Sequence, residues 1–336
     1  MRSTLVFYIV TIKIAILNLR RSRRTKPFIC DKTCTFTIQQ GDNVSIYNDE
    51  AYSQVINEFV NDTYYVEGQS YGTKIEKIRQ YTEIILRRLL KYDPKKMLEL
   101  GDKRVIRQLD EKGYVEEWFR SSLDTIRKKG NNRTHTQVRK VATEEEFNNV
   151  VNSLFDLYAY LFYDFFKRHR FGTNSKILTA FSLLPPVIRY ITLTKLFEID
   201  NSNIYVIDKL AIATLKAKNK DEAIKWIESH EKDFSKLSSW DENAKQDFLN
   251  QLGPELGINV INSVPNMYDL CYQRVEKIDL YRNDKISYDS FESALRGYKK
   301  YGHIDGTTED VQEFNQLMSF VFMGRKEQEK EGARVF

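Results

Sequence analysis

Residues 143 to 166 carry the longest helical pattern in the chain, and this pattern limits the possible folds more than any other feature. It opens with Thr143-Glu144-Glu145-Glu146, which is typical of a capping box at the start of a helix. One apolar stripe then contains Phe147, Val150, Val151, Leu154, Tyr158, Leu161, Phe162 and Phe165, and Phe155, Leu157, Tyr160, Tyr163 and Phe166 widen it. A helix that is apolar over most of its circumference is buried, so residues 151 to 166 either contact another molecule or are covered by later helices.

The composition also favours helices. The chain has 336 residues, of which 41% are hydrophobic, enough for one large or two ordinary domains. It contains only six prolines and 14 glycines, whereas strands need frequent turn residues between them. We therefore predict an all-α fold.

Two further helical patterns precede the apolar one. Residues 75 to 89 place Ile75, Ile78, Tyr81, Thr82, Ile85 and Leu89 on one face, which predicts an amphipathic helix that ends before Pro94. A pattern from Tyr114 to Lys129 predicts another helix, for which Gly130 supplies the stop signal. With an earlier helix capped at Asn48-Asp49-Glu50, residues 43 to 172 are expected to form the first helical domain.

Helical patterns continue beyond Gly172. They cover Ser175 to Tyr190, with an interruption at Pro185-Pro186, and then Tyr205 to Lys216, Asp221 to Glu231, Asp241 to Asn250, Ser290 to Lys300 and Thr308 to Met323. Residues 205 to 231 are expected to form a helical hairpin, but no fixed repeat period is present. We predict a second helical module over residues 173 to 325, for recognition or oligomerisation. The polar end from Arg325 to Arg334 is expected to be a frayed tail, with residues 326 to 336 outside the module.

The N-terminal residues 1 to 42 are expected to be an extension of the first domain. Thr4 to Leu19 is mostly apolar, and Arg20-Arg21-Ser22-Arg23-Arg24 follows directly. These 16 apolar residues fall short of the roughly 20 that a membrane-spanning helix needs. We therefore favour an added element or extension over a membrane anchor, which would leave the globular part cytoplasmic.

Several kinds of site are disfavoured by the sequence. The three cysteines, Cys30, Cys34 and Cys271, have no partners at zinc-binding spacing, and we interpret them as free thiols in the cytoplasm. His169, His230 and His303 lack neighbouring ligands and are expected at the surface or at helix ends. The chain has no Walker A motif, no Gly-x-Gly-x-x-Gly fingerprint and no Gly-x-Ser-x-Gly elbow. No metal or cofactor is predicted.

A basic loop lies between the helix that ends near Lys129 and the helix that begins near Thr143. From Arg127 to Lys140 the chain has six basic residues and no acid: Arg127, Lys128, Lys129, Arg133, Arg139 and Lys140. The total net charge of +5 is a mild excess, so this local cluster carries more weight than the whole-chain balance. It indicates an anionic partner, for which a phosphate backbone is the natural candidate.

The same loop resembles the motif of the HEPN superfamily over roughly residues 48 to 170. The run Arg127-x-x-Gly130-Asn131-x-x-x-His135 ends one helix and precedes a long apolar helix, similar to the branch whose motif is Gly-Asn-x-Ala-Ala-His. Arg133-Thr134 stands where that branch has two alanines, and Gly130 stands where the nuclease motif of the superfamily has arginine. The resemblance implies a helical bundle, RNA as a partner, a homodimer formed through this domain, and a role in host defence or as a toxin.

The resemblance also implies a metal-independent endoribonuclease. Histidine suits proton transfer near neutral pH, so His135 is the expected acid or base. Asn131 would orient His135 or the phosphate, and Arg127, or Arg133 in its place, would stabilise charge on the phosphate. Lys128, Lys129, Arg133, Arg139 and Lys140 would bind the RNA backbone, and Glu76 or Glu83 would orient a motif side chain.

Other interpretations stay open. Gly130 and Asn131 are also typical of a helix end with positive φ, and His135 of a cap on the next segment. The competing function is a noncatalytic helical module that contacts RNA, nucleotide or protein. Gly130 favours this alternative, whereas Asn131 and His135 favour the enzyme. The run Phe165-Phe166-Lys167-Arg168-His169-Arg170-Phe171 is either an extension of an RNA path or the polar end of a buried helix. The second module is a candidate site for a regulatory protein partner.

Overall fold

The computed structural model describes residues 50–93, 95–131, 141–280 and 290–327. Over these ranges the chain is all-α, as the sequence predicts, with fifteen helices and no named strand. The helices are α2 Glu50–Tyr64, α3 Tyr71–Leu90, α4 Lys103–Glu111, α5 Glu117–Asn131, α6 Glu144–Arg168, α7 Ser175–Phe181, α8 Pro186–Ile199, α9 Ile204–Ala217, α10 Lys220–Ser229, α11 Glu231–Phe234, α12 Glu242–Leu252, α13 Pro254–Ser263, α14 Met267–Leu280, α15 Phe291–Tyr301 and α16 Glu309–Phe322.

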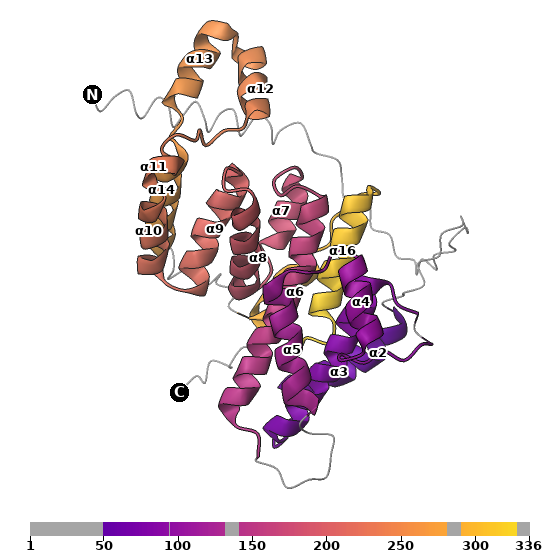
Figure 1. The fold of residues 1–336 in the computed structure, drawn as a ribbon. Coiled ribbons are helices and arrows are strands. Elements are labelled where there is room, and N and C mark those ends of the chain that lie inside the picture. The colour runs from indigo at the N-terminus through magenta and orange to yellow at the C-terminus, as the bar shows by residue number, and fades with distance from the viewer. Residues whose placement is uncertain (1–49, 94, 132–140, 281–289, 328–336) are drawn as a thin grey trace, which may run out of the picture. The chain divides into compact units, whose positions relative to one another are not determined.

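Helix α6 lies at the centre of the packing. Its capping box forms as expected, since the Thr143 hydroxyl accepts from the Glu146 amide and the Glu146 carboxylate accepts from the Thr143 amide. Its large side chains, among them Tyr158, Phe162 and Phe165, are fully buried. They pack against α3, α5, α8 and α16 (Figure 1). Of the two ways to bury this helix, the structure therefore shows the one within the chain itself.

Helices α3 and α5 flank α6 on one side (Figure 1). All six residues of the predicted α3 stripe, from Ile75 to Leu89, are buried. The helix ends at Leu90, and Lys91 caps it in the left-handed conformation. In α5 the prediction for Gly130 was wrong: the helix continues to Asn131, and Gly130 is a buried residue of its last turn without a positive φ. Its role is close packing, described below.

The hydrophobic core does not stop at residue 172. One continuous cluster runs from Ile56 in α2 to Phe322 in α16 and includes α7, α8 and part of α9. The described residues accordingly fall into one compact unit. A smaller cluster joins α9, α10, α11 and α14, and Ala211, Leu215, Ala223 and Ile227 there form the predicted helical hairpin.

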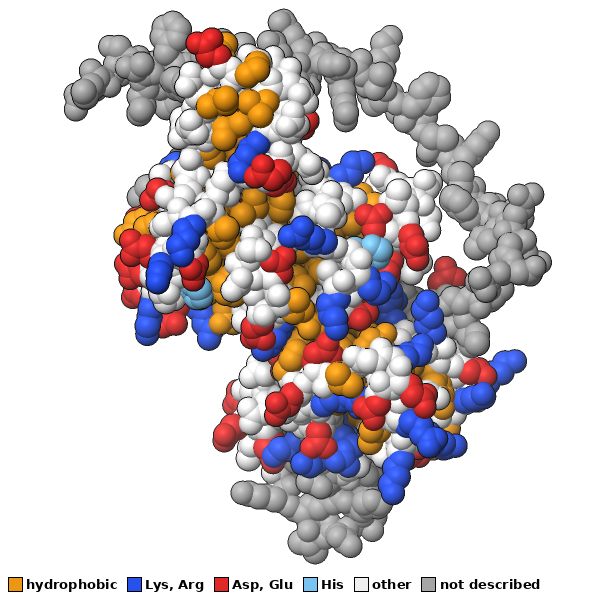
Figure 2. All heavy atoms as spheres, turned by 45° about the horizontal axis from the view of Figure 1, so that its top comes forward, with side chains coloured by type: hydrophobic (Ala, Val, Ile, Leu, Met, Phe, Trp, Pro, Cys, Tyr) orange, Lys and Arg blue, Asp and Glu red, His pale blue; other side chains and the backbone are white. Residues whose placement is uncertain are grey.

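Helices α12 and α13 pack mainly against each other. No residue of α12 is buried, and in α13 only Gly257 is. Leu252, Leu256 and Ile258 are exposed, and apolar side chains gather over this hairpin (Figure 2). The hairpin therefore contributes little to the core.

The C-terminal end of the described chain is anchored, which corrects the expectation of a frayed tail that begins at Arg325. The Arg325 side chain is only 3% exposed. Its guanidinium lies over the rings of Tyr64 and Phe291 and donates to the Tyr158 hydroxyl at 3.4 Å. The Lys326 amide donates to the Tyr65 hydroxyl. Aromatic side chains from α2, α6 and α15 thus bury Arg325, which its polar sequence neighbours suggested would be exposed.

The apolar segment from Thr4 to Leu19 lies outside the described residues, as does the whole N-terminal extension. Among the helices that the structure describes, none has both the length and the apolar character needed to cross a bilayer.

Candidate functional site

The predicted site residues divide into two groups. Arg127, Lys128, Lys129 and Asn131 lie in the last two turns of α5. His135, Arg133, Arg139 and Lys140 lie in the segment 132–140, outside the described residues. The structure therefore places only the α5 side of the site.

Two cations at the end of α5 share a single carboxylate. Lys128 Nζ lies 2.6 Å from Asp124 Oδ2, and Arg127 Nη2 lies 2.5 Å from Asp124 Oδ1. Hydrogen bonds from Lys128 and then Arg127 lower the pKa of Asp124 below its ordinary value. The Lys128 side chain is 67% exposed, and exposed ion pairs of this kind are weak. One acid for two cations leaves excess positive charge at this helix end.

Lys129 links the end of α5 to the start of α6. Its Nζ lies 2.8 Å from Glu146 Oε1, and the same carboxylate completes the α6 capping box. The helix ends on either side of residues 132–140 are therefore tied together. The Lys129–Glu146 ion pair thus joins the end of α5 to the start of α6, the two helix ends that we call the base of the basic loop.

Gly130 of α5 packs closely against Arg79 of α3. A Cβ atom added at Gly130 would lie 3.0 Å from Cβ and 3.1 Å from Cγ of Arg79, and closer still to Cδ. The stem of Arg79 therefore occupies the space that any larger residue at position 130 would need. Sequence reasoning missed Arg79, because its polar position on α3 gave no signal of contact with α5.

Glu83 lies one turn beyond Arg79 on α3. Its Oε1 is 3.6 Å from Arg79 Nη2, which is an ion pair but too long for a hydrogen bond. Burial raises the pKa of Glu83, although the charges of Arg79 and Arg87 oppose this shift. Glu76 and Glu83 are the two acids proposed to support the motif. Glu83 pairs with Arg79, and the side chain of Arg79 contacts Gly130 of the motif.

The aromatic and basic run from Phe165 to Phe171 does not form an RNA path. Phe165, Phe166 and Phe171 are buried in the core and cannot stack on bases. The three cations of the run are each paired: Lys167 with Glu116, Arg168 with Glu313 and Asp164, and Arg170 with Asp200. The prediction of the polar end of a buried helix is confirmed here.

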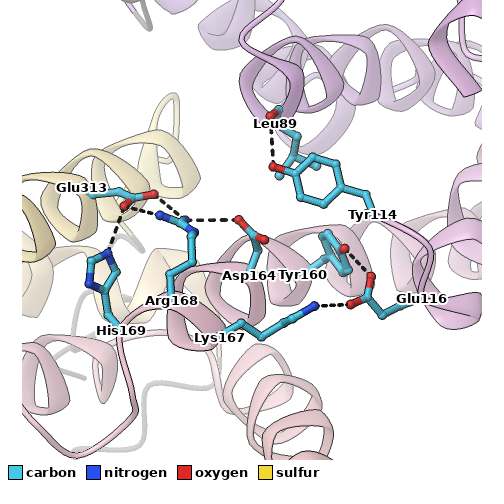
Figure 3. A network of polar contacts seen from close by, with 9 residues as sticks. All are labelled: Leu89, Tyr114, Glu116, Tyr160, Asp164, Lys167, Arg168, His169 and Glu313. Carbon is cyan, nitrogen blue, oxygen red and sulfur yellow. Dashed lines mark hydrogen bonds and ion pairs between the residues drawn. The ribbon is translucent and has the colours of Figure 1, made fainter. Parts of the chain in front are cut away.

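These contacts form a polar network between α6, α16 and the start of α5 (Figure 3). Arg168 donates from both terminal nitrogens to Glu313, each at 2.7 Å. His169 Nε2 lies 3.4 Å from the same carboxylate, and the Tyr160 hydroxyl donates to Glu116 at 2.5 Å. Each of its two permanent cations, Lys167 and Arg168, has a carboxylate partner, so the network joins helices and leaves no excess positive charge for an anionic ligand.

The three other histidines lie at the surface or at helix ends, as the sequence predicts. His169 and His230 cap the ends of α6 and α10, and His303 is exposed. Cys271 is a free, buried thiol, and burial raises its pKa to about 12. Cys30 and Cys34 lie outside the described residues. In the part of the chain that the structure covers, no three His, Cys, Asp or Glu side chains gather at metal-binding distance.

The end of α5 carries Arg127, Lys128 and Lys129, and the stem of Arg79 packs against Gly130 in the same turn. Guanidinium and ammonium groups are suited to binding phosphate groups. On the face drawn in Figure 2, in contrast, Lys and Arg side chains are interspersed with Asp and Glu. Comparison of this chain with protein-family models, with curated proteins and with solved structures found no match.

Proposed function

We propose that this chain is a HEPN-like, RNA-directed protein that binds the RNA backbone at the C-terminal end of α5. One observation carries the proposal: the last turns of α5 carry three cations, of which Arg127 and Lys128 share the single carboxylate of Asp124. Lys129 pairs with Glu146, so the helix end keeps an excess positive charge. The chain continues from there into a segment with three more cations and no acid. Such a cluster attracts a polyanion, and phosphate contacts supply most of the affinity for nucleic acid.

The packing of the first domain supports the HEPN resemblance. Helices α3, α5 and α6 pack against one another, and the motif connects the last two of them. In that superfamily the motif of two copies faces one cleft, so we include a homodimer in the proposal. The host-defence or toxin setting and a cytoplasmic location rest on the resemblance and the sequence alone.

The leading activity is metal-independent RNA cleavage. A ribose 2′-oxygen would attack the adjacent phosphorus, the bond to the 5′-oxygen would break, and the products would be a 2′,3′-cyclic phosphate and a 5′-hydroxyl. One proton must leave the 2′-hydroxyl and one must reach the 5′-oxygen, and His135 is the residue of the motif suited to proton transfer. Arg127 would stabilise the added negative charge and Asn131 would orient the reacting groups.

The alternative is a noncatalytic module that binds RNA or nucleotide through the same basic helix end, or contacts a protein partner. Gly130 favours it, because the nuclease motif has arginine at that position. In this form of the proposal the later helices α7 to α16 contact a regulatory partner.

Cleavage of a pool of tRNA and single-stranded RNA in EDTA separates the two activities. We would compare the wild-type protein with His135→Ala and with the control His303→Ala, which removes an exposed histidine. Cleavage to 2′,3′-cyclic phosphate ends that persists in the control and is lost in His135→Ala supports the nuclease. Binding of the same RNA without cleavage by any of the three proteins supports the noncatalytic module.

A further inference from the structure

Arg79 projects from the middle of α3 onto the backbone of the motif in α5. The atoms nearest to a side chain built at Gly130 are its Cβ, Cγ and Cδ. This contact fixes the arginine stem, so less side-chain entropy remains to be lost when the guanidinium binds a ligand. The absence of a side chain at Gly130 is what makes room for it.

The guanidinium of Arg79 has one ion pair but no hydrogen bond among the described residues. Arg79 is only 19% exposed, and its nearest acid, Glu83, lies 3.6 Å away. Its Nε is buried without a hydrogen-bond partner among the described residues. An oxyanion bound at the terminal nitrogens would supply the charge-assisted hydrogen bonds that the described residues do not give this side chain.

Arg87, two turns along α3, shows what a purely structural arginine looks like in this protein. It donates to the carbonyl oxygens of Asp93 at 3.1 Å and Lys96 at 2.8 Å. Its guanidinium also lies over the Tyr92 ring. Arg87 therefore has its hydrogen bonds within the protein, whereas Arg79 is held by packing of its stem.

We infer that Arg79 is a phosphate-binding residue of the α5 site. It brings from α3 a guanidinium to the end of α5, where the motif has Gly130 in place of arginine. This inference rests on the proposed function, and it names the group that would hold non-bridging phosphate oxygens of RNA. Arg127 and the lysines then add charge around it.

The test is the salt dependence of binding to a fluorescently labelled single-stranded RNA. Arg79→Gln keeps most of the stem and removes the charge, Arg79→Lys keeps the charge, and Arg104→Gln removes an 82% exposed arginine of α4 as the matched control. Arg79→Gln should weaken binding about tenfold. It should also reduce the slope of log K against log salt by about 0.7, the value for one lost phosphate contact on a single strand. Arg79→Lys should restore the slope.

Glu83→Gln provides a second test, in which the RNA affinity is expected to increase. Removal of the only acid paired with Arg79 should strengthen RNA binding several-fold, with Glu242→Gln, at an 87% exposed acid of α12, as control. A merely structural Arg79 gives no such gain. Circular dichroism of each variant establishes that the helices are intact.

The outcomes separate the inference from the proposed function. If the wild-type protein binds RNA, and Lys128→Gln weakens binding while Arg79→Gln behaves like Arg104→Gln, the inference is wrong and the proposed function stands. If the wild-type protein shows no salt-dependent RNA binding, both are wrong. A smaller slope of log K against log salt in Arg79→Gln, restored in Arg79→Lys, supports both the inference and the proposed function.

Discussion

The side chain of Arg79 on α3 lies across the backbone of Gly130 on α5, so close that a methyl group at Gly130 would be 3.0 Å from Arg79 Cβ. The glycine is therefore required by packing between two helices, and its φ is not positive. The contact thus connects the predicted motif, which begins in α5, to α3.

Replacement of Gly130 tests this contact. Gly130→Ala should destabilise the protein by about 1 to 3 kcal/mol, because the added methyl group overpacks the site. In an Arg79→Ala background the cost should shrink or become a gain of about 0.5 to 1 kcal/mol, since alanine is the better helix former. Urea unfolding of the four proteins measures both effects. If Gly130→Ala lowered the free energy of unfolding equally in the wild type and in Arg79→Ala, contact with Arg79 would not be the reason for glycine at position 130.

The Arg168–Glu313 pair should make stability depend on pH. Burial opposes ionisation of Glu313, but hydrogen bonds from Arg168 and its charge outweigh burial and hold the pKa of Glu313 below its ordinary value. The stabilisation is then present above the ordinary pKa of about 4.3 and is lost as the pH falls through the lower folded-state value. The pKa of Asp164, raised by burial, acts in the opposite direction.

Glu313→Gln isolates that contribution, because Asp164 is unchanged in the variant. Its free energy of unfolding at neutral pH should be about 1 kcal/mol lower than that of the wild type. Below pH about 4 the two proteins should converge. Urea unfolding across this range gives the comparison, and a constant difference at every pH would contradict the assignment.

Arg325 should be essential for stability although it lies near the polar end of the chain. Arg325→Ala removes a guanidinium packed between Tyr64 and Phe291, and the expected loss is about 2 to 4 kcal/mol. Arg296→Ala, at a 66% exposed arginine of α15, should change stability by less than about 0.5 kcal/mol. Similar melting temperatures for the two variants would mean that the buried arginine contributes little.

Helices α12 and α13 should open far more often than α6. Since α12 has no buried residue, little apolar surface opposes local unfolding. Hydrogen exchange followed by mass spectrometry should show fast exchange for residues 242 to 263 and slow exchange for residues 150 to 166. Equal protection of both segments would indicate that another molecule covers the hairpin.

Local sequence patterns predicted the parts of the fold that depend on local physics. The α6 capping box and the α3 stripe need only residues within a few turns of one another, and both form as expected. The end of α5 was misjudged because glycine serves both as a helix stop and as a point of close helix packing, and only the neighbouring helix distinguishes these roles.

The tertiary contacts could not be predicted in this way. Arg79 lies outside the apolar stripe of α3, and nothing in the sequence links it to Gly130. Arg325 precedes a polar segment, and its burial depends on rings from α2 and α15. The sequence leaves the basic run from Lys167 to Arg170 open between an RNA path and a helix end, because Glu116, Asp200 and Glu313, the acids that pair with it, lie elsewhere in the chain.

The most direct test of the central claim is RNA binding by a variant that lacks the two α5 lysines. Lys128→Gln/Lys129→Gln is compared with Lys299→Gln/Lys300→Gln, which removes two consecutive lysines from the last turn of α15. Fluorescence anisotropy with single-stranded RNA over a range of salt concentrations gives affinity and slope. We predict that the α5 variant loses about tenfold or more in affinity and about 1.4 in slope, two phosphate contacts, while the α15 variant binds like the wild type. Equal behaviour of the two variants would contradict an RNA site at the end of α5.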